Sequence, residues 1–208
     1  MPDAKVLNSY YLSKDIIPTL DKAFASINTD YVVYCGVEFG DRCFFRPQEL
    51  ASIALDFVTS QQRYYVDLWH PLECFSNIPA QNFPTIKCYG LKEDVLAVTQ
   101  QVSKYLDLHM PVIHMPINNN LYIGQASHPK ASKGNALKRL VDELNLSSLP
   151  VIAAGDYNND ESMLTIADIK IVMDSAPENL KEKASIIAPP SEQLGIIEGL
   201  TKAIKDFT

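Results

Sequence analysis

The fold of this 208-residue chain is indicated most clearly by one stretch, PVIAAGDYNND at residues 150–160. Its first half is a short apolar run that ends in glycine, and its second half carries two carboxylates four residues apart. A short apolar run of this kind is typical of a buried parallel strand. The carboxylates that follow such a strand lie at the C-terminal edge of the sheet, where open α/β sheets bind ligands.

The polar half of the stretch predicts a binding site. Asn158 or Asn159 can cap the helix that follows, and Glu161 falls in its first turn, where the helix dipole favours a negative charge. Asp156 and Asp160, with amide side chains between them, form an oxygen-rich group that suits Mg2+ together with a phosphate. The alternative interpretation is a capped strand-to-helix loop whose acids are simply solvated.

A second candidate site residue lies one helix upstream. Lys133 opens a helical pattern, and a cation at a helix N-terminus is disfavoured by the dipole unless an anion is bound nearby. A compact ammonium group is a suitable partner for a phosphoryl oxygen and a carboxylate together. The apolar residues of this helix fall on one face and predict a buried side: Leu137, Leu140, Val141 and Leu144.

Together these residues resemble a known family. Lys133-Gly134 followed by Gly155-Asp156-x-x-Asn159-Asp160 resembles the third and fourth motifs of the haloacid dehalogenase-like (HAD) phosphatases. The chain is most similar to the branch with a large α/β cap, which includes Cof-type sugar phosphatases and sucrose-phosphate phosphatase. Residues 163–181 resemble the segment that follows the metal loop in that branch. Residues 30–39 are similar to the strand and hairpin where the chain passes from the core domain into the cap domain.

The resemblance implies an α/β fold, with a Rossmann-like parallel-sheet core and an inserted α/β cap domain. We expect residues 1–35 and 132–208 to form the core and residues 36–131 to form the cap. Strand and helix patterns alternate through the cap segment, as expected for α/β layers. In order, they are a hairpin at 37–45, a helix entered at Pro47, a strand at 64–69, an irregular loop at 71–84, a strand at 85–89, a helix at 92–106 and two strands within 111–123.

The same resemblance implies a chemistry, the Mg2+-dependent hydrolysis of a phosphorylated sugar or a similar small metabolite. Asp156 and Asp160 would serve the metal, with Asp160 acting through water or a hydrogen bond. Lys133 and Ser9 would hold phosphoryl oxygens and stabilise the developing charge, and Asn159 would contact the phosphate. A sugar-phosphate mutase of the same branch is an alternative.

One departure from the family concerns the nucleophile, which is the first Asp of an Asp-x-Asp motif on the central strand. The chain has 15 Asp residues, and none is followed by another two positions later. Residues 5–9 align best with the family's second motif, a strand that ends in Thr or Ser, here Ser9. Alternatively, residues 8–10 are a degenerate first motif, which also leaves no nucleophile. We expect an omitted N-terminal strand and helix, and the alternative is a non-catalytic homologue that binds Mg2+, phosphometabolites or a partner protein.

Three residues of the expected cap are candidate substrate contacts, because in the family the cap closes over the site and sets substrate choice. They are Trp69, His70 and Tyr122. Each also has an ordinary structural interpretation. A lone Trp is usually a core residue, and a His before Pro71 is usually a loop residue with a local hydrogen bond.

Composition narrows the possible partners and location. The net charge is −7 and no basic run is present, which argues against nucleic acid and anionic membranes as partners. No stretch approaches the roughly 18 apolar residues of a membrane span. The four cysteines have no metal-like spacing and the N-terminus has no signal pattern, so we expect reduced thiols in a cytoplasmic protein.

A dinucleotide-binding oxidoreductase is disfavoured because no Gly-x-Gly-x-x-Gly follows a strand. The oligomeric state stays open.

Overall fold

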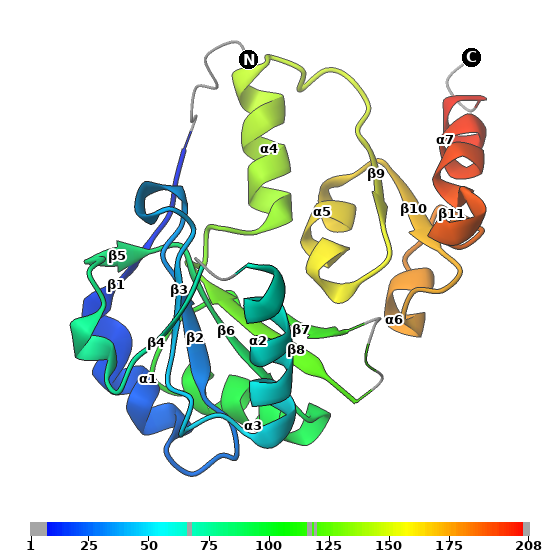
Figure 1. Ribbon diagram of the computed structural model, residues 1–208. Helices are drawn as coiled ribbons and strands as arrows, with labels where there is room; N and C mark the ends of the chain where they lie inside the picture. Colours follow the sequence, from blue (N-terminus) through cyan, green and yellow to red (C-terminus); the bar gives the residue numbers. More distant parts are fainter. Residues whose placement is uncertain (1–7, 66–67, 116–117, 119, 206–208) are drawn as a thin grey trace. The chain divides into compact units, whose positions relative to one another are not determined.

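The computed structural model describes residues 8–65, 68–115, 118 and 120–205. The chain forms two compact units, Met1–Ala131 and Ser132–Thr208, and Figure 1 labels their helices and strands. The first unit has a six-stranded sheet and the second a three-stranded sheet. Separate hydrophobic clusters lie in each, so each unit has a core of its own.

The second unit is built on a parallel sheet. Its strands are β9 (Ile152–Gly155), β10 (Ile169–Met173) and β11 (Ile186–Ala188), in the order β11-β10-β9. Both pairings are parallel. The prediction of a parallel strand before the acidic loop is therefore confirmed, and β9 delivers that loop to the C-terminal edge of the sheet.

Helices cover both faces of this parallel sheet. They are α4 (Lys133–Glu143), α5 (Glu161–Ile166), α6 (Glu178–Lys181) and α7 (Gly195–Lys205). On one face, Leu164 of α5 and Leu180 of α6 join a buried cluster with Val172. On the other face, α7 presents the small residues Gly199 and Ala203, so its backbone approaches the sheet closely. Helix α4 packs against α5.

The first unit is built on a mixed sheet with the strand order β4-β3-β2-β6-β8-β7. Adjacent strands are antiparallel except for the parallel pair β3 and β4. In sheet order the strands are β4 (Trp69–Pro71), β3 (Cys43–Phe45), β2 (Tyr31–Tyr34), β6 (Thr85–Gly90), β8 (Tyr122–Ser127) and β7 (Val112–His114). A separate antiparallel pair joins β1 (Leu12–Ser13) to β5 (Asn82–Phe83).

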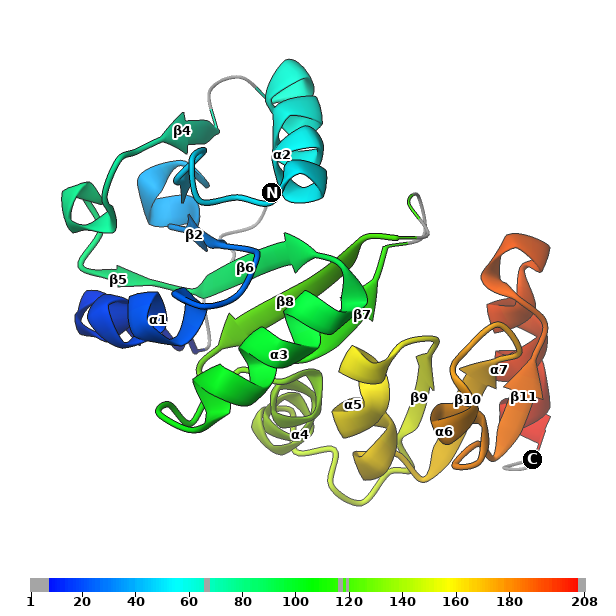
Figure 2. The ribbon, with the colours of Figure 1, turned by 90° about the horizontal axis from the view of Figure 1, so that it is seen from below.

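Alternating residues of the central strand β2 divide the core of this unit into two layers. Tyr31 and Val33 join the cluster that includes residues of α1 (Ile17–Phe24) and α3 (Lys92–Ser103). Val32 points the other way and joins the cluster of α2 (Ser52–Tyr64). Figure 2 shows α1 and α3 on one side of the sheet and α2 on the opposite side. The alternation follows from the period of two along a strand.

Two sequence predictions inside this unit are wrong. The predicted strand at 64–69 is misplaced, because α2 continues to Tyr64 and the strand β4 begins only at Trp69; residues 66 and 67 lie outside the described part. The predicted irregular loop at 71–84 contains a short 3-10 helix at Phe75–Asn77 and the strand β5. Tyr64 and Tyr65 have a high strand propensity, but they are 80% and 55% exposed at the end of α2, so their residue type suggested a strand that no buried sheet face supports.

The N-terminal boundary also differs from the expected one. Residues 1–35 were expected to lie with the core, but β2 pairs with β3 and β6 inside the sheet of the first unit, and α1 packs on α3. The two units divide between Ala131 and Ser132. The physical reason is hydrogen bonding, because β2 fills the centre of a sheet whose other strands all belong to residues 43–127. The assignment of the two units as cap and core stays a prediction.

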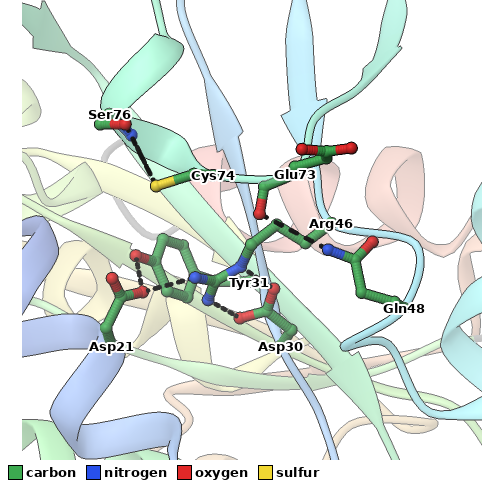
Figure 3. A network of polar contacts seen from close by, with 8 residues as sticks. All are labelled: Asp21, Asp30, Tyr31, Arg46, Gln48, Glu73, Cys74 and Ser76. Carbon is green, nitrogen blue, oxygen red and sulfur yellow. Dashed lines mark hydrogen bonds and ion pairs between the residues drawn. The ribbon is translucent and has the colours of Figure 1, made fainter.

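A partly buried charged network surrounds Arg46 in the first unit (Figure 3). Arg46 donates from Nε to Asp30 Oδ2 at 2.8 Å and from Nη2 to Asp30 Oδ1 at 2.7 Å. Its Nη1 lies 3.0 Å from Asp21 Oδ1, which also accepts from the hydroxyl of Tyr31 at 2.8 Å. The guanidinium lies 4.4 Å from the ring centroid of Phe75. Asp30 is only 2% exposed, and burial raises its pKa even though the contacts with Arg46 act in the opposite direction.

Two further observations concern the chain as a whole. Among the helices that the structure describes, none is both long and apolar enough to cross a membrane. All four cysteines are free thiols, of which Cys74 is exposed and Cys35, Cys43 and Cys88 are buried. The expected cytoplasmic location stays a prediction.

Candidate active site

The acidic loop after β9 is held in shape by one carboxylate. Asp160 Oδ2 accepts hydrogen bonds from the backbone N–H groups of Asp156 at 3.1 Å and Tyr157 at 3.2 Å. The backbone N–H of Asp160 in turn donates to the carbonyl oxygen of Tyr157 at 2.9 Å. Gly155 is required here, because a Cβ on it would lie 2.5 Å from the Cβ of Asp160. The loop therefore folds back on its strand, and Asp156 stays partly exposed.

Lys133 meets this loop from the start of α4. Its ammonium group forms an ion pair and hydrogen bond with Asp160 Oδ1. The helix begins at Lys133 because Ser132 caps it, accepting from the backbone N–H of Asn135 at 3.1 Å. Asp160 is 4% exposed, so its negative charge is compensated by one cation and two backbone N–H groups.

The contact between α4 and α5 fixes the position of Lys133 further. The backbone N–H of Gly134 donates to Ser162 Oγ at 3.1 Å. A Cβ on Gly134 would lie 2.3 Å from the carbonyl oxygen of Ser162, so only glycine permits this approach. Ser162 carried no sequence signal other than its place as the second residue of the helix after the acidic loop.

This close approach gives a direct test. Gly134→Ala should destabilise the second unit by about 2–4 kcal/mol, because backbone atoms rather than a flexible side chain would have to move. Hydrogen exchange of the amides in α4 and α5 should become faster. Gly90→Ala is the control, since its new Cβ would meet nothing closer than 3.6 Å and should leave exchange in its own strand nearly unchanged. Unchanged exchange in α4 of the Gly134→Ala protein would contradict the close packing.

Beside the loop lies an open hollow of about 480 Å3, formed by residues of the second unit alone. Lys133, Asp156 and Asp160 line it, together with Ser191 and the apolar residues Ala154, Met163, Met173 and Ile196. Partial burial and then the nearby charge of Asp160 raise the pKa of Asp156, while Lys133 acts to lower it. A carboxylate with a raised pKa in a hollow beside a cation is a typical feature of a functional site. No sequence signal marked Met173, Ser191 or Ile196.

The structure brings together three of the predicted site residues, Lys133, Asp156 and Asp160. Asn159 belongs to the same loop, and its Oδ1 is buried without a hydrogen-bond partner among the described residues. Ser9 is exposed in the first unit and lies in no strand, and residues 1–7 lie outside the described part. The described strands of the parallel sheet all come from residues 152–188. Residues 5–7 of the predicted second-motif strand lie outside the described part, so the role of Ser9 stays a prediction.

The three candidate substrate contacts of the first unit do not form one group. Trp69 is 8% exposed and packs edge-on against Tyr34. His70, the next residue of β4, faces the opposite side and stacks on Phe44 at 5.3 Å. Tyr122 lies on β8, which β3, β2 and β6 separate from β4. Their role as substrate contacts stays a prediction.

The hollow offers oxygen atoms, which are the ligands that Mg2+ prefers. Asp156 and Asp160 are the carboxylates that line it, and both oxygens of Asp160 already accept hydrogen bonds. Asp156 can therefore bind a cation directly, whereas Asp160 acts by holding the loop and Lys133. The buried oxygen of Asn159 suits a cation or one of its water ligands. Within the described ranges, no group of three or more His, Cys, Asp or Glu side chains forms a metal site.

Fold and site together define a class, an α/β protein with a lysine–aspartate pair and a second carboxylate at the C-terminal edge of a parallel sheet. A family model described as haloacid dehalogenase-like hydrolase matches residues 1–200. The chain therefore belongs to the haloacid dehalogenase-like hydrolases, as its motifs indicated.

Curated relatives resemble part of the chain. A phosphoglycolate phosphatase of Archaeoglobus fulgidus is 38% identical over 69 residues, which is 33% of this chain and 31% of that protein. Phosphatase YwpJ of Bacillus subtilis is 39% identical over 72 residues, which is 35% of this chain and 25% of that protein. The matched region thus spans about a quarter to a third of the length of these relatives.

Solved structures resemble nearly the whole chain. SMU.1108c from Streptococcus mutans has a TM-score of 0.71 at 17% identity, covering 96% of this chain and 71% of that one. BT1666 from Bacteroides thetaiotaomicron has a TM-score of 0.71 at 17% identity, covering 97% and 69%. The HAD subclass IIB sugar phosphatase BT4131 has a TM-score of 0.64 at 14% identity, covering 96% and 68%. At these identities the similarity establishes the fold.

Proposed function

We propose that this chain is the larger part of a Mg2+-dependent phosphomonoester hydrolase that acts on a phosphorylated sugar or a similar small metabolite. The observation that carries the proposal is the arrangement of Lys133, Asp160 and Asp156 around one hollow at the end of β9. A cation next to two carboxylates suits a phosphate with a bound metal ion better than either ligand alone. The sugar phosphatase BT4131, which has the same fold, supports the substrate class.

The residues of the chain have separate tasks in this proposal. Lys133 neutralises a phosphoryl oxygen, and its charge becomes more valuable as negative charge develops in the transition state. Asp160 positions that ammonium and keeps the loop closed through its two backbone contacts. Asp156 would hold Mg2+, which when bound polarises phosphoryl oxygens as a Lewis acid. Asn159 would complete the loop's contacts with the metal's water or with the phosphate.

The nucleophile in this proposal comes from a further segment of polypeptide. A carboxylate oxygen of that segment attacks phosphorus, the alcohol leaves with a proton, and water then cleaves the acyl-phosphate to regenerate the carboxylate. Among the described residues, β9 is the edge strand of its sheet and pairs on one side only, with β10. An open edge beside Asp156 can accept one more strand.

Exposed apolar residues on α4 are a second, independent argument for such a segment. Its sequence predicted a buried apolar face, yet Leu140 and Leu144 are 46% and 55% exposed, and Leu149 in the following loop is 57% exposed. A helix whose apolar stripe stays in water lacks the packing that normally stabilises it. A strand and helix added next to β9 and α4 would bury this stripe.

The metal assignment can be tested on the chain by itself. Mg2+ should raise the melting temperature of the wild-type protein, and at a free concentration ten times Kd the stabilisation is about 1.4 kcal/mol. Asp156→Asn should remove this effect, because an amide is a weaker ligand for a hard cation. Asp142→Asn on exposed α4 is the matched control and should keep it. Equal shifts from Mg2+ in all three proteins would refute the role of Asp156.

The activity is tested by adding the segment. The 208-residue chain should release no phosphate from small phosphomonoesters, whereas the chain extended by a strand and helix with Asp-x-Asp should do so only with Mg2+. Release of inorganic phosphate identifies a hydrolase, and transfer within the sugar without release identifies a mutase. A non-catalytic homologue is the alternative, favoured by the missing Asp-x-Asp. It predicts binding of sugar phosphates by the extended chain without turnover.

A further inference from the structure

A second hollow, of about 410 Å3, lies in the first unit on the side of the sheet that α2 covers. Its walls are mostly aromatic and aliphatic and come from five strands and α2. Its lining includes Tyr34, Phe57, Trp69, Tyr89 and Ile123 together with two charged side chains, Lys87 and the exposed Asp41. A hollow of this size with apolar walls and a few polar groups has the usual character of a small-molecule site.

One cation lies inside this apolar hollow. Lys87 projects from the middle of β6, and its Nζ lies 4.6 Å from the ring centroid of Tyr34. In the described part of the chain, no carboxylate forms an ion pair with it within 4.0 Å, although four other lysines do form such pairs. Burial lowers the pKa of Lys87, so folding desolvates this charge while no described carboxylate forms an ion pair with it.

Polar groups beside the lysine give the hollow a fixed shape. The hydroxyls of Tyr34 and Tyr89 are hydrogen-bonded to each other at 2.5 Å, and Trp69 packs edge-on against Tyr34 at 5.9 Å between ring centroids. Phe57 of α2 packs against Tyr89 at 4.7 Å. These contacts join the four rings into one wall of the hollow, and the ring of Tyr34 lies against the ammonium group. A flat molecule can therefore lie against this wall with its charged group near Lys87.

A purely structural role for Lys87 is the alternative. A lysine that only covers apolar surface usually extends its charge to water, whereas this ammonium lies over an aromatic ring inside a hollow. Keeping an unpaired cation there costs stability, and residues that cost stability are typical of binding sites.

We propose that this hollow binds a small organic anion with a flat apolar body, an aromatic carboxylate, whose charged group pairs with Lys87. The ring of the ligand would lie among Phe57, Trp69 and Tyr89, and its carboxylate would take the place of the missing anionic partner. The site lies wholly in the first unit and uses none of Lys133, Asp156, Asn159 and Asp160; it shares with the expected substrate contacts only Trp69. The proposal for this site can therefore be tested independently of the phosphatase proposal.

The chain contains a single tryptophan, and it lines this hollow, so its fluorescence reports on the site directly. The probe is 4-iodobenzoate, whose iodine quenches a nearby indole, and the matched neutral compound is 4-iodobenzamide. We expect saturable quenching of Trp69 by the carboxylate, with a Kd at least tenfold lower than that of the amide. This comparison uses the unmodified chain, so it does not depend on how any variant folds.

Variants then assign the selectivity to one residue. Lys87→Met should raise the Kd of 4-iodobenzoate at least tenfold and leave that of the amide nearly unchanged, while Lys87→Arg should keep most of the preference. Lys92→Met is the control. Lys92 begins α3, on the other side of the sheet, and its ammonium group lies over the ring of Tyr122. Lys87→Met should also melt no lower than wild type. Quenching that does not saturate, equal Kd values for the two compounds, or equal effects of Lys87→Met and Lys92→Met would each overturn the proposal.

Discussion

Arg46→Met should lower the free energy of unfolding of the first unit by about 3–5 kcal/mol, since it leaves a buried carboxylate without its cation. Asp30 is 2% exposed and receives two of the hydrogen bonds of Arg46, and Asp21 loses its ion pair as well. Urea unfolding followed by Trp69 fluorescence measures this loss, because the single tryptophan belongs to the same unit. Arg42→Met, at an exposed position in that unit, should change stability by less than about 0.5 kcal/mol.

Low pH should reduce the loss of stability that Arg46→Met causes. Burial raises the pKa of Asp30 already in the wild-type protein, and without Arg46 it should rise further. A native state that holds the proton more tightly than the unfolded chain loses stability as pH increases above the ordinary aspartate pKa of about 4. The Arg46→Met protein should therefore be closer to wild type near pH 4.5 than near pH 7, and Asp30→Asn combined with Arg46→Met should recover part of the loss. A deficit that is the same at both pH values would show that Asp30 does not cause it.

Lys133→Ala in the extended, active protein should lower kcat at least about a hundredfold, the usual effect of removing one group that stabilises transition-state charge. Because Lys133 also compensates Asp160, part of the effect could come from a displaced loop. Two measurements separate the roles. A loss in kcat at nearly constant KM indicates transition-state stabilisation, whereas hydrogen exchange in the 156–160 loop reports loop displacement.

The matched control for this variant is Lys138→Ala, at an exposed position on the same helix. It should leave kcat within about twofold of wild type, since surface substitutions away from such features have small effects. Similar losses from Lys133→Ala and Lys138→Ala would point to a general effect of charge and not to a role of Lys133 in the site.

The sequence was informative where one local signal corresponds to one structure. An apolar run ending in Gly155 and Asp156 could be only a buried strand with an acidic loop at its edge, and Ser132 before Lys133 defined the start of α4. It failed at 64–69, where the aromatic residues near the end of α2 imitate a strand. It also could not assign Ser9, because a short apolar run does not reveal which sheet accepts it.

The role of Asp160 shows how the tertiary structure refines a motif. From the sequence, Asp156 and Asp160 are equivalent carboxylates four residues apart. In the structure Asp160 turns inward, accepts two backbone N–H groups and pairs with Lys133, while Asp156 lines the hollow. Hydrogen bonds that the loop makes to itself divide the two roles, and residue spacing alone does not specify them.

By itself, the sequence determined the fold class, the parallel strand β9, the helix that begins at Lys133 and the family, because those depend on local periodicity, capping and motif spacing. Only the tertiary structure decided that β2 and α1 belong to the first unit, that Arg46 neutralises Asp30 and that Lys87 lies over the ring of Tyr34 in an aromatic hollow. Each of these depends on strands far apart in sequence becoming neighbours. Pairing of this kind is set by the burial and hydrogen bonding of the whole sheet, which no local pattern encodes.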